Sequence, residues 1–318
     1  MQIIRHIAEQ SQDLAGSVVT LGNFDGIHLG HQALIAGAVS DSKKLALPSV
    51  VLTFEPHPLS VLAPDRAPKL ILVRKDKMQL LQTLGVDIVA VQHFDLSFAA
   101  LSAEDFVRDL LVGRLKARKI WVGKDLRFGQ GRRGDVEDLR RWGRAFGFEV
   151  AVVEPVLVDG NRVSSSCIRE FLSDGRVDEV KAMLGRYHFI SGRVVEGHRR
   201  GKELGFPTAN LFSRTEVLPG DGIYATLFHL GTRVLPSVSS VGLNPTFGAG
   251  PRTVESFIMG FDENIYGDAA QLSFVKRIRN EIKFSSVADL IAQIRNDVRD
   301  AEAILRGVRI DKIASASP

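Results

Sequence analysis

The first half of the chain alternates between short β-rich runs and runs with helical spacing, and this alternation limits the fold more than any other feature. Strands are predicted over residues 17–21, 49–54, 87–91, 119–122 and 148–153. Helices are predicted over residues 30–44, 74–84 and 135–145, and another is expected to begin at the cap Ser102. Strands separated by helices imply βαβ units, so this half should form a parallel sheet covered on both faces.

The pattern changes in the second half. After short helical pieces over residues 166–173 and 177–184, short strands separated by turns are predicted over residues 189–195, 222–229, 234–241, 253–258 and 271–278. This pattern predicts a small antiparallel barrel or sandwich, which a helix over residues 287–305 would close. We therefore expect two domains, residues 1–185 and 186–318.

Composition agrees with two ordinary domains and limits the cellular compartment and the class of ligand. At 318 residues and 45% hydrophobic content the chain can bury two cores. It has no run of 18 apolar residues and no signal-peptide pattern, and its one cysteine, Cys167, excludes an internal disulfide. A cytoplasmic protein without membrane contact is expected, and its oligomeric state stays open. The net charge of +4 suits phosphorylated ligands, and no basic run interleaved with aromatic residues favours nucleic acid.

Two histidines follow the first predicted strand in a loop framed by glycines. Gly22, Gly26 and Gly30 allow the backbone to turn tightly and to approach a ligand. The N-terminus of the following helix attracts phosphate. His28 and His31 stand three residues apart, so both imidazoles can face one phosphate group. The loop is therefore a predicted phosphate site.

Two other interpretations of these histidines remain open from the residues alone. One histidine could cap the helix while the other is a core residue, although the pair inside a glycine loop favours a ligand. A zinc site is a weaker interpretation, because no third ligand of matching kind lies nearby in the sequence.

Basic residues and glycines cluster again in the second half. Gly197 and Gly201 frame two arginines, and Lys202 follows, which suits a loop over a polyphosphate. Thr208 and Asn210 carry hard oxygen ligands of the kind that Mg²⁺ binds. On charge alone, an exposed turn with a solvated basic run explains this segment better.

One glycine pattern favours a dehydrogenase instead of an enzyme that acts on phosphate groups. Gly129, Gly131 and Gly134 form a literal GxGxxG between a predicted strand and a predicted helix, as in a Rossmann dehydrogenase. That fingerprint places its first glycine directly after the strand, whereas here residues 124–128 intervene. We therefore prefer a phosphate-transfer enzyme, with the dehydrogenase as the alternative.

The segment GNFDGIHLGH at residues 22–31 resembles the HxGH signature of nucleotidyltransferases. More fully, it resembles the FMN adenylyltransferase half of prokaryotic bifunctional riboflavin kinase/FAD synthetases. Three further segments match that family in order, at residues 54–58, 123–135 and 164–169. In the second half, GFPTAN at residues 205–210, GLNPTFG at 242–248 and RNEIKF at 279–284 match the riboflavin kinase part. The strand around Glu255 resembles the strand that bears that family's general base, although Phe257 stands where a polar residue is usual.

The resemblance implies an α/β nucleotidyltransferase domain with a Rossmann-like parallel sheet, followed by a small antiparallel β-barrel riboflavin kinase domain with a C-terminal helix. It implies ATP, riboflavin and FMN as substrates and Mg²⁺ as cofactor. A non-enzymatic alternative is a nucleotide- or RNA-binding protein, against which the ordered acid, base and metal-type residues speak.

The implied site residues fall into four groups. Catalytic roles are expected for Glu255, as the base for riboflavin's hydroxyl, and for His28, His31 and Arg169 on ATP phosphates. Nucleotide binding is expected of Gly22, Asn23, Phe24, Asp25, Gly30, Ser164, Ser165, Ser166, Gly197, Gly201 and Lys202. Flavin-binding or loop roles are expected of His57, Asp125, Arg127 and Phe128, and metal binding of Thr208 and Asn210.

Overall fold

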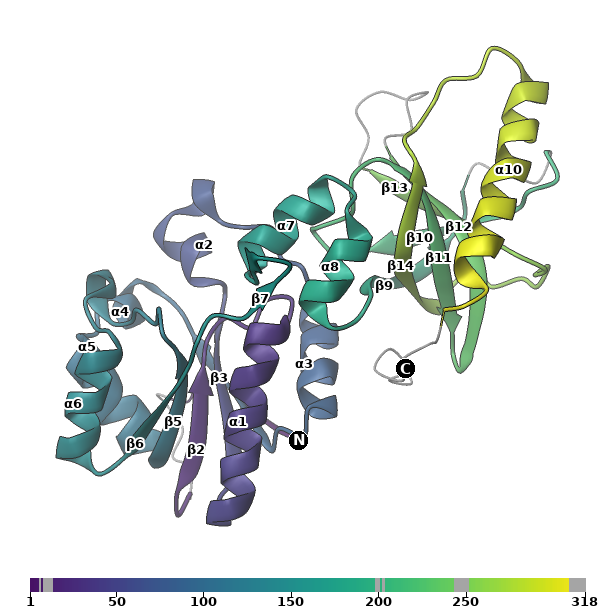
Figure 1. Ribbon diagram of the computed structural model, residues 1–318. Helices are drawn as coiled ribbons and strands as arrows, with labels where there is room; N and C mark the ends of the chain where they lie inside the picture. The colour runs from purple at the N-terminus through teal and green to yellow at the C-terminus, as the bar shows by residue number, and fades with distance from the viewer. Residues whose placement is uncertain (6, 8–13, 198–200, 202–203, 243–251, 309–318) are drawn as a thin grey trace. The chain divides into compact units, whose positions relative to one another are not determined.

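Two compact units make up the chain in a computed structural model, which describes residues 1–5, 7, 14–197, 201, 204–242 and 252–308 (Figure 1). The first unit comprises Met1–Lys69 and Arg74–Ser164, and the second comprises Leu70–Val73 and Ser165–Pro318. The two helices after residue 164 therefore group with the second unit, as does the short strap before residue 74.

A parallel sheet forms the centre of the first unit, as the alternation predicts. Within the described residues it has six strands in the order β1-β4-β3-β2-β5-β6, and every pairing is parallel. The strands are β1 (Gln2–Arg5), β2 (Ser17–Leu21), β3 (Ser49–Glu55), β4 (Ile88–His93), β5 (Ala117–Gly123) and β6 (Glu149–Val153). The edge strand β1 lies outside the predicted set.

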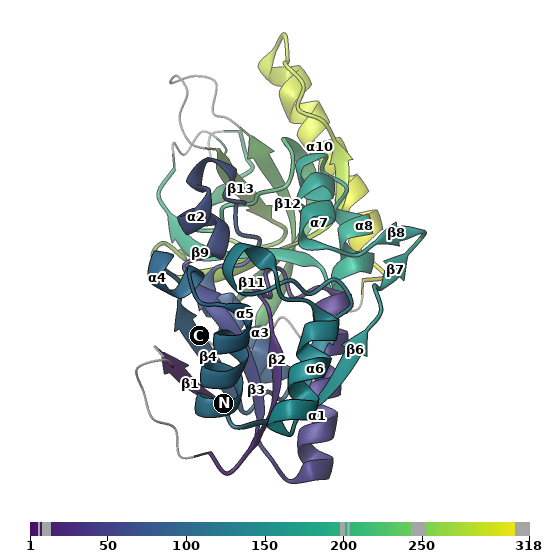
Figure 2. The ribbon, with the colours of Figure 1, turned by 90° about the vertical axis from the view of Figure 1, so that its left-hand side faces the viewer.

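Helices cover both faces of this sheet. One face carries α1 (Leu29–Leu45) and α3 (Arg74–Thr83), and the other carries the π-helix η2 (Phe106–Arg114) and α6 (Val136–Phe146), the face seen in Figure 2. Because both faces are covered, all five residues of β2 are buried. Shorter elements of this unit are α2 (Pro58–Leu62), η1 (Pro64–Arg66), α4 (Leu96–Ala99), α5 (Ala103–Asp105), η3 (Gln130–Arg132), β7 (Leu157–Val158) and β8 (Asn161–Arg162).

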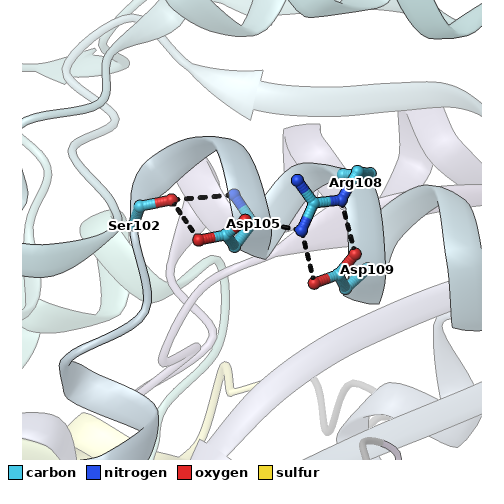
Figure 3. A network of polar contacts seen from close by, with 4 residues as sticks. All are labelled: Ser102, Asp105, Arg108 and Asp109. Carbon is cyan, nitrogen blue, oxygen red and sulfur yellow. Dashed lines mark hydrogen bonds and ion pairs between the residues drawn. The ribbon is translucent and has the colours of Figure 1, made fainter.

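The cap expected at Ser102 is present (Figure 3). Ser102 Oγ accepts a hydrogen bond from the Asp105 N–H at 3.0 Å and donates to the Asp105 carboxylate at 2.6 Å. These bonds and the Arg108 guanidinium hold the pKa of Asp105 below its usual value. Arg108 also pairs with Asp109. Ser102, Arg108 and Asp109 are exposed and Asp105 is half-buried, so the network fixes where the helix starts and adds little stability.

A closed antiparallel barrel forms the second unit, which settles the choice between barrel and sandwich. In the described part of this unit the strand order is β10-β13-β12-β11-β14-β9. The strands are β9 (His188–Val195), β10 (Thr208–Ser213), β11 (Gly222–Leu230), β12 (Arg233–Gly242), β13 (Thr253–Ile258) and β14 (Ala269–Arg279). The helices α7 (Ser165–Ser173) and α8 (Val177–Leu184) precede the barrel. β10 lies outside the predicted set of strands, because Thr208 and Asn210 belong to a segment that a loop or an exposed turn explains equally well.

The last helix, α10 (Val287–Leu305), packs along the barrel as predicted (Figure 1). Its Ala301 joins Ala225 and Val238 in a small apolar cluster. A bidentate ion pair joins Asp297 of α10 to Arg279 at the end of β14, with N–O distances of 2.8 and 2.7 Å. None of the helices described here is both long and apolar enough to cross a bilayer.

Candidate active sites

The loops that carry the first predicted site leave the carboxyl ends of neighbouring strands. β3, β2 and β5 are adjacent in the sheet, and they lead into residues 56–57, 22–28 and 124–128. β3 and β4 lie on one side of β2, whereas β5 and β6 lie on the other. The strand order therefore reverses its direction at β2. Open α/β sheets bind ligands where the strand order reverses, outside the carboxyl ends of the strands. The fold therefore gathers the first-half motifs at the edge where a ligand is expected.

The loop after β2 is built in an unusual backbone conformation. Phe24 and Ile27 have φ of 49° and 42°, in the left-handed region that residues with a Cβ rarely adopt. Their side chains are 0% and 1% exposed, so core packing holds a loop shape that is costly by itself. Gly26 has φ of 83°, which only glycine adopts without strain. Core packing and Gly26 therefore define the shape of this loop.

His28 and His31 meet at the start of α1. His28 is the N-cap, and its Nδ1 accepts a hydrogen bond from the His31 N–H at 3.3 Å. An imidazole that accepts at Nδ1 carries its proton at Nε2, so Nε2 is a donor. The two rings stack with centroids 3.6 Å apart, and a Cβ on Gly30 would lie 3.2 Å from His28 Cε1. His28 is therefore a helix cap, and capping also orients its ring.

His31 is held in its neutral form. Burial lowers the pKa of its imidazole well below the usual value, and electrostatic interactions with His28 and Lys77 lower it further. Its Nδ1 is buried without a hydrogen-bond partner among the described residues. Phe24 packs edge-on against the His31 ring with centroids 5.2 Å apart. A neutral imidazole here can donate to a phosphate oxygen without the cost of burying a charge.

Further side chains at this edge lie around Asn23. Asn23 Nδ2 lies 3.0 Å from His57 Nε2, so two of the predicted residues are in contact. Lys77 of α3 donates to the Asn23 carbonyl and to Thr53 Oγ1, each at 3.3 Å. Lys77 was absent from the predicted site, because a lysine inside an amphipathic helix carries no sequence signal of its own.

The residues predicted after β5 have different surroundings. Asp125 pairs with Arg162 of β8, and Arg127 pairs with Asp135 at 3.1 Å. Phe128 is buried, with its ring 5.6 Å from that of Phe106. Asp125 and Arg127 are therefore half-exposed polar groups at the sheet edge, whereas Phe128 belongs to the core.

The GxGxxG segment does not form a dinucleotide turn. Asp135 caps α6, accepting from the N–H groups of Glu137 and Asp138 at 3.0 and 3.1 Å, so a carboxylate occupies the place where a pyrophosphate would bind. A Cβ on Gly129 would lie 2.5 Å from the Ala103 backbone, and one on Gly134 would lie 2.7 Å from Ala103 Cβ. These glycines serve close packing, which removes the observation that favoured a dehydrogenase.

The serine and arginine segment lies at the division between the units. Ser164 is the last residue of the first unit, while Ser165, Ser166 and Arg169 belong to α7 in the second.

The barrel brings the second set of predicted residues together. β10 pairs with β13 so that Asn210 lies opposite Glu255 and Thr208 lies opposite Phe257. Directly opposed residues share one side of a sheet, so these four side chains form one outer surface. Thr208 Oγ1 donates to Glu255 Oε2 at 3.4 Å. Phe206 packs edge-on against Phe257 with ring centroids 5.3 Å apart, which explains an aromatic residue at this position.

Two glycines lie directly on this surface. A Cβ on Gly197 would lie 2.1 Å from Asn210 Nδ2. A Cβ on Gly201 would lie 2.3 Å from the Phe206 carbonyl oxygen and 3.5 Å from Thr208 Oγ1. Both glycines are thus needed for the close approach of their segment to β10. Lys202 lies outside the described residues, as does most of the GLNPTFG segment.

A second carboxylate lies near Glu255. Ser240 of β12 is opposite Glu255, and Ser240 hydrogen-bonds to the Glu281 carboxylate. Burial raises the pKa of Glu281. A Cβ on Gly242 would lie 2.1 Å from Glu281 Oε1. Glu281 lies in the predicted RNEIKF segment but had no assigned role.

Comparison with known proteins now identifies the family. A family model described as FAD synthetase matches residues 10–167, and one described as riboflavin kinase matches residues 184–305. The bifunctional riboflavin kinase/FMN adenylyltransferase of Escherichia coli (strain K12) is 40% identical over 299 residues, covering 93% of this chain and 96% of its own length. The chain belongs to the bifunctional riboflavin kinase/FMN adenylyltransferase family.

Other members of the bifunctional riboflavin kinase/FMN adenylyltransferase family agree over similar lengths. The Haemophilus influenzae protein is 36% identical over 304 residues, covering 95% of this chain and 99% of its own. The Listeria monocytogenes protein is 35% identical over 291 residues, covering 90% and 91%. A crystal structure from Streptococcus pneumoniae described as a macrolide-efflux protein has a TM-score of 0.86 and 32% identity, covering 97% of this chain and 100% of its own. That structure supports the fold, and its name differs from those of the three relatives.

Proposed function

We propose that the chain makes FAD from riboflavin in two steps, each of which consumes ATP. Residues 186–318 phosphorylate riboflavin to FMN, and residues 1–185 transfer the adenylyl group of a second ATP to FMN. One observation carries this proposal. Each family model falls largely within one of the two compact units, and each unit holds side chains suited to phosphate chemistry.

The adenylyl step needs no protein nucleophile. A phosphate oxygen of FMN attacks the α-phosphorus of ATP in line, and the bond to the β-phosphate breaks to release pyrophosphate. The loop of Gly22, Asn23, Phe24, Asp25 and Gly30 places His28 and His31 at a helix N-terminus, where phosphate charge is stabilised.

A second group of residues holds the departing pyrophosphate in this proposal. Arg169 and the hydroxyls of Ser164, Ser165 and Ser166 bind the β- and γ-phosphates. Loss of one such donor should lower turnover on the order of 10²–10³-fold. His57, Asp125 and Arg127, at the ends of β3 and β5, are our candidates for contacts with FMN. Phe128 contributes by packing.

The kinase step uses Glu255 as its base. The carboxylate takes the proton from the 5′-hydroxyl of riboflavin as that oxygen attacks the γ-phosphorus of ATP, and ADP leaves. Thr208 Oγ1, 3.4 Å from Glu255 Oε2, helps to orient the carboxylate.

The donors around Glu255 fit Mg²⁺, which favours oxygen ligands and keeps several waters. Thr208 supplies a hydroxyl and Asn210 an amide oxygen on the same surface. We propose that these two residues hold the ion together with ATP phosphates, and that the ion offsets phosphate charge. Gly197, Gly201 and Lys202 form the loop over the polyphosphate in this proposal.

The cytoplasmic location of the protein also stays a prediction.

Incubation with riboflavin, ATP and Mg²⁺, with chromatography over time, tests the function. FMN should appear first, FAD should follow after a lag, and omission of ATP should abolish both. Turnover that persists as salt is raised would also exclude a nucleic-acid-binding protein, whose affinity falls steeply with salt. No flavin product, or tight NAD(P)H binding without ATP dependence, would refute the proposal.

A further inference from the structure

Lys77 reaches from α3 to the phosphate-binding loop of the first unit. Its Nζ donates to the carbonyl oxygen of Asn23 and to Thr53 Oγ1, each at 3.3 Å. Thr53 is fully buried at the end of β3, and its hydroxyl donates to the same Asn23 carbonyl at 3.3 Å. Two donors from two different elements therefore converge on one backbone oxygen of the loop.

The Asn23 carbonyl is a sensitive point for the loop. A trans peptide is planar, so its C=O and the following N–H point in opposite directions. A fixed Asn23 oxygen thus fixes the direction of the Phe24 N–H. Phe24 is also one of the two loop residues with left-handed φ, so its peptide plane has to be held against relaxation.

Lys77 also contributes charge at this edge. Its ammonium is half-buried, and burial lowers its pKa while Glu55 and Asp25 raise it. Arg74, which forms an ion pair with Glu55 at 3.4 Å, lowers the pKa of Lys77. Lys77 in turn lowers the pKa of His31, after the larger effects of burial and His28. The positive charge of Lys77 therefore favours the neutral imidazole of His31.

We propose that Lys77 is a positioning residue for adenylyl transfer, which fixes the Asn23–Phe24 peptide and brings a positive charge to the loop that leads into the two histidines. This inference rests on the adenylyltransferase function proposed above. The side chain acts through the loop and through His31, and the geometry assigns it no contact with reacting atoms.

The variant Lys77→Met removes the ammonium and leaves a side chain of similar length. It should fold, because Thr53 still donates to the Asn23 carbonyl. FAD formation from added FMN should slow on the order of 10- to 100-fold, because small misplacements of reacting groups have effects of this size. The fall should be in kcat more than in KM for ATP. Riboflavin phosphorylation by the same molecules should be unchanged.

The pH profile separates positioning from general stability. Without the neighbouring charge the pKa of His31 rises, so its neutral form is lost at a higher pH and the acid limb of FAD formation should move upward. Lys77→Arg keeps the charge and should leave that limb in place. Lys77→Gln keeps a donor without charge, so it should retain more activity than Lys77→Met yet show the upward shift. Lys75→Met, an exposed position on the same helix, is the matched control.

The outcomes are distinct. If wild-type protein makes no FAD, the proposed function fails and not the role of Lys77. If wild type makes FAD and Lys77→Met matches it within twofold with the same acid limb, the role is refuted. Equal loss of both activities with a lower melting temperature in Lys77→Met and Lys77→Gln would show a purely structural role and would also refute it.

Discussion

At the scale of single residues, His28 combines a structural task with a proposed chemical one, and substitution can separate them. His28→Ala removes the α1 cap and the imidazole together, and loss of a cap costs about 0.5–2 kcal/mol. His28→Asn keeps a capping oxygen, because asparagine is a favoured N-cap. We expect chemical denaturation to show near-normal stability for His28→Asn and reduced stability for His28→Ala, with FAD formation lost in both. Recovery of FAD formation in His28→Asn would mean that capping is the whole role.

Glu255 offers a second test at this scale. Glu255→Gln preserves the size and the polar contact with Thr208 but removes the base. Riboflavin phosphorylation should fall at least 100-fold, within the range for general bases. Conversion of added FMN to FAD should continue, because Glu255 is not among the residues proposed for that step. Glu302→Gln, at an exposed position of α10, is the control. Loss of both activities in folded Glu255→Gln would contradict separate sites.

Spacing by itself predicts proximity only for residues that lie close together in the sequence. His28 and His31 share one loop, and Thr208 and Asn210 share one strand, so their spacing is readable. Lys77 is 54 positions from Asn23 and Glu281 is 41 from Ser240, and only the folded chain makes them neighbours. Phe128 shows the reverse case, since a motif position proves to be a core residue.

At the scale of elements, two buried histidines make the barrel sensitive to acid. Burial lowers the pKa of His188 on β9 to about 3, helped by Arg186, and that of His229 on β11 to about 4. Both are near 6.5 in an unfolded chain. Below that pH the unfolded chain binds more protons than the folded chain. The free energy of unfolding therefore keeps its full value above about pH 6.5 and declines toward pH 4.

Urea denaturation between pH 7.5 and 4.5 measures this decline. Each histidine should contribute a slope of up to about 1.4 kcal/mol per pH unit. His188→Phe fills the position beside Phe274 with an aromatic ring that does not titrate. The slope of the unfolding free energy against pH should therefore fall by the contribution of one histidine. An unchanged slope would show that His188 does not titrate differently in the two states.

The helices and strands also show which predictions from sequence patterns were confirmed and which were wrong. The strand and helix periods predicted the parallel sheet, and α10 begins and ends at the predicted residues. The GxGxxG pattern misleads because a pattern does not specify which groups occupy the helix N-terminus, and here Asp135 does. β10 was missed because Pro207 and the glycines before it are turn signals, whereas its pairing partners β9 and β13 are distant in the sequence.

At the scale of the whole molecule, the order of the two parts could be predicted and the path of the chain between them could not. The pattern of predicted elements changes near residue 185, yet α7, α8 and the strap Leu70–Val73 group with the barrel unit. In that strap Ile71 is fully buried, and the Leu70 N–H donates to Glu216 at 2.6 Å. Four apolar residues between two predicted elements give no sign of which unit they join.

We expect FMN to leave the chain that made it before it is adenylylated, and a mixture of variants can test this. Given riboflavin and ATP, Glu255→Gln should make no FMN, and His28→Asn should stop at FMN. A mixture should make FAD, because FMN released by one protein can enter the intact site of the other. The lag before FAD appears should shorten as protein concentration rises. If the mixture makes no FAD although Glu255→Gln converts added FMN, then FMN does not leave the chain that made it.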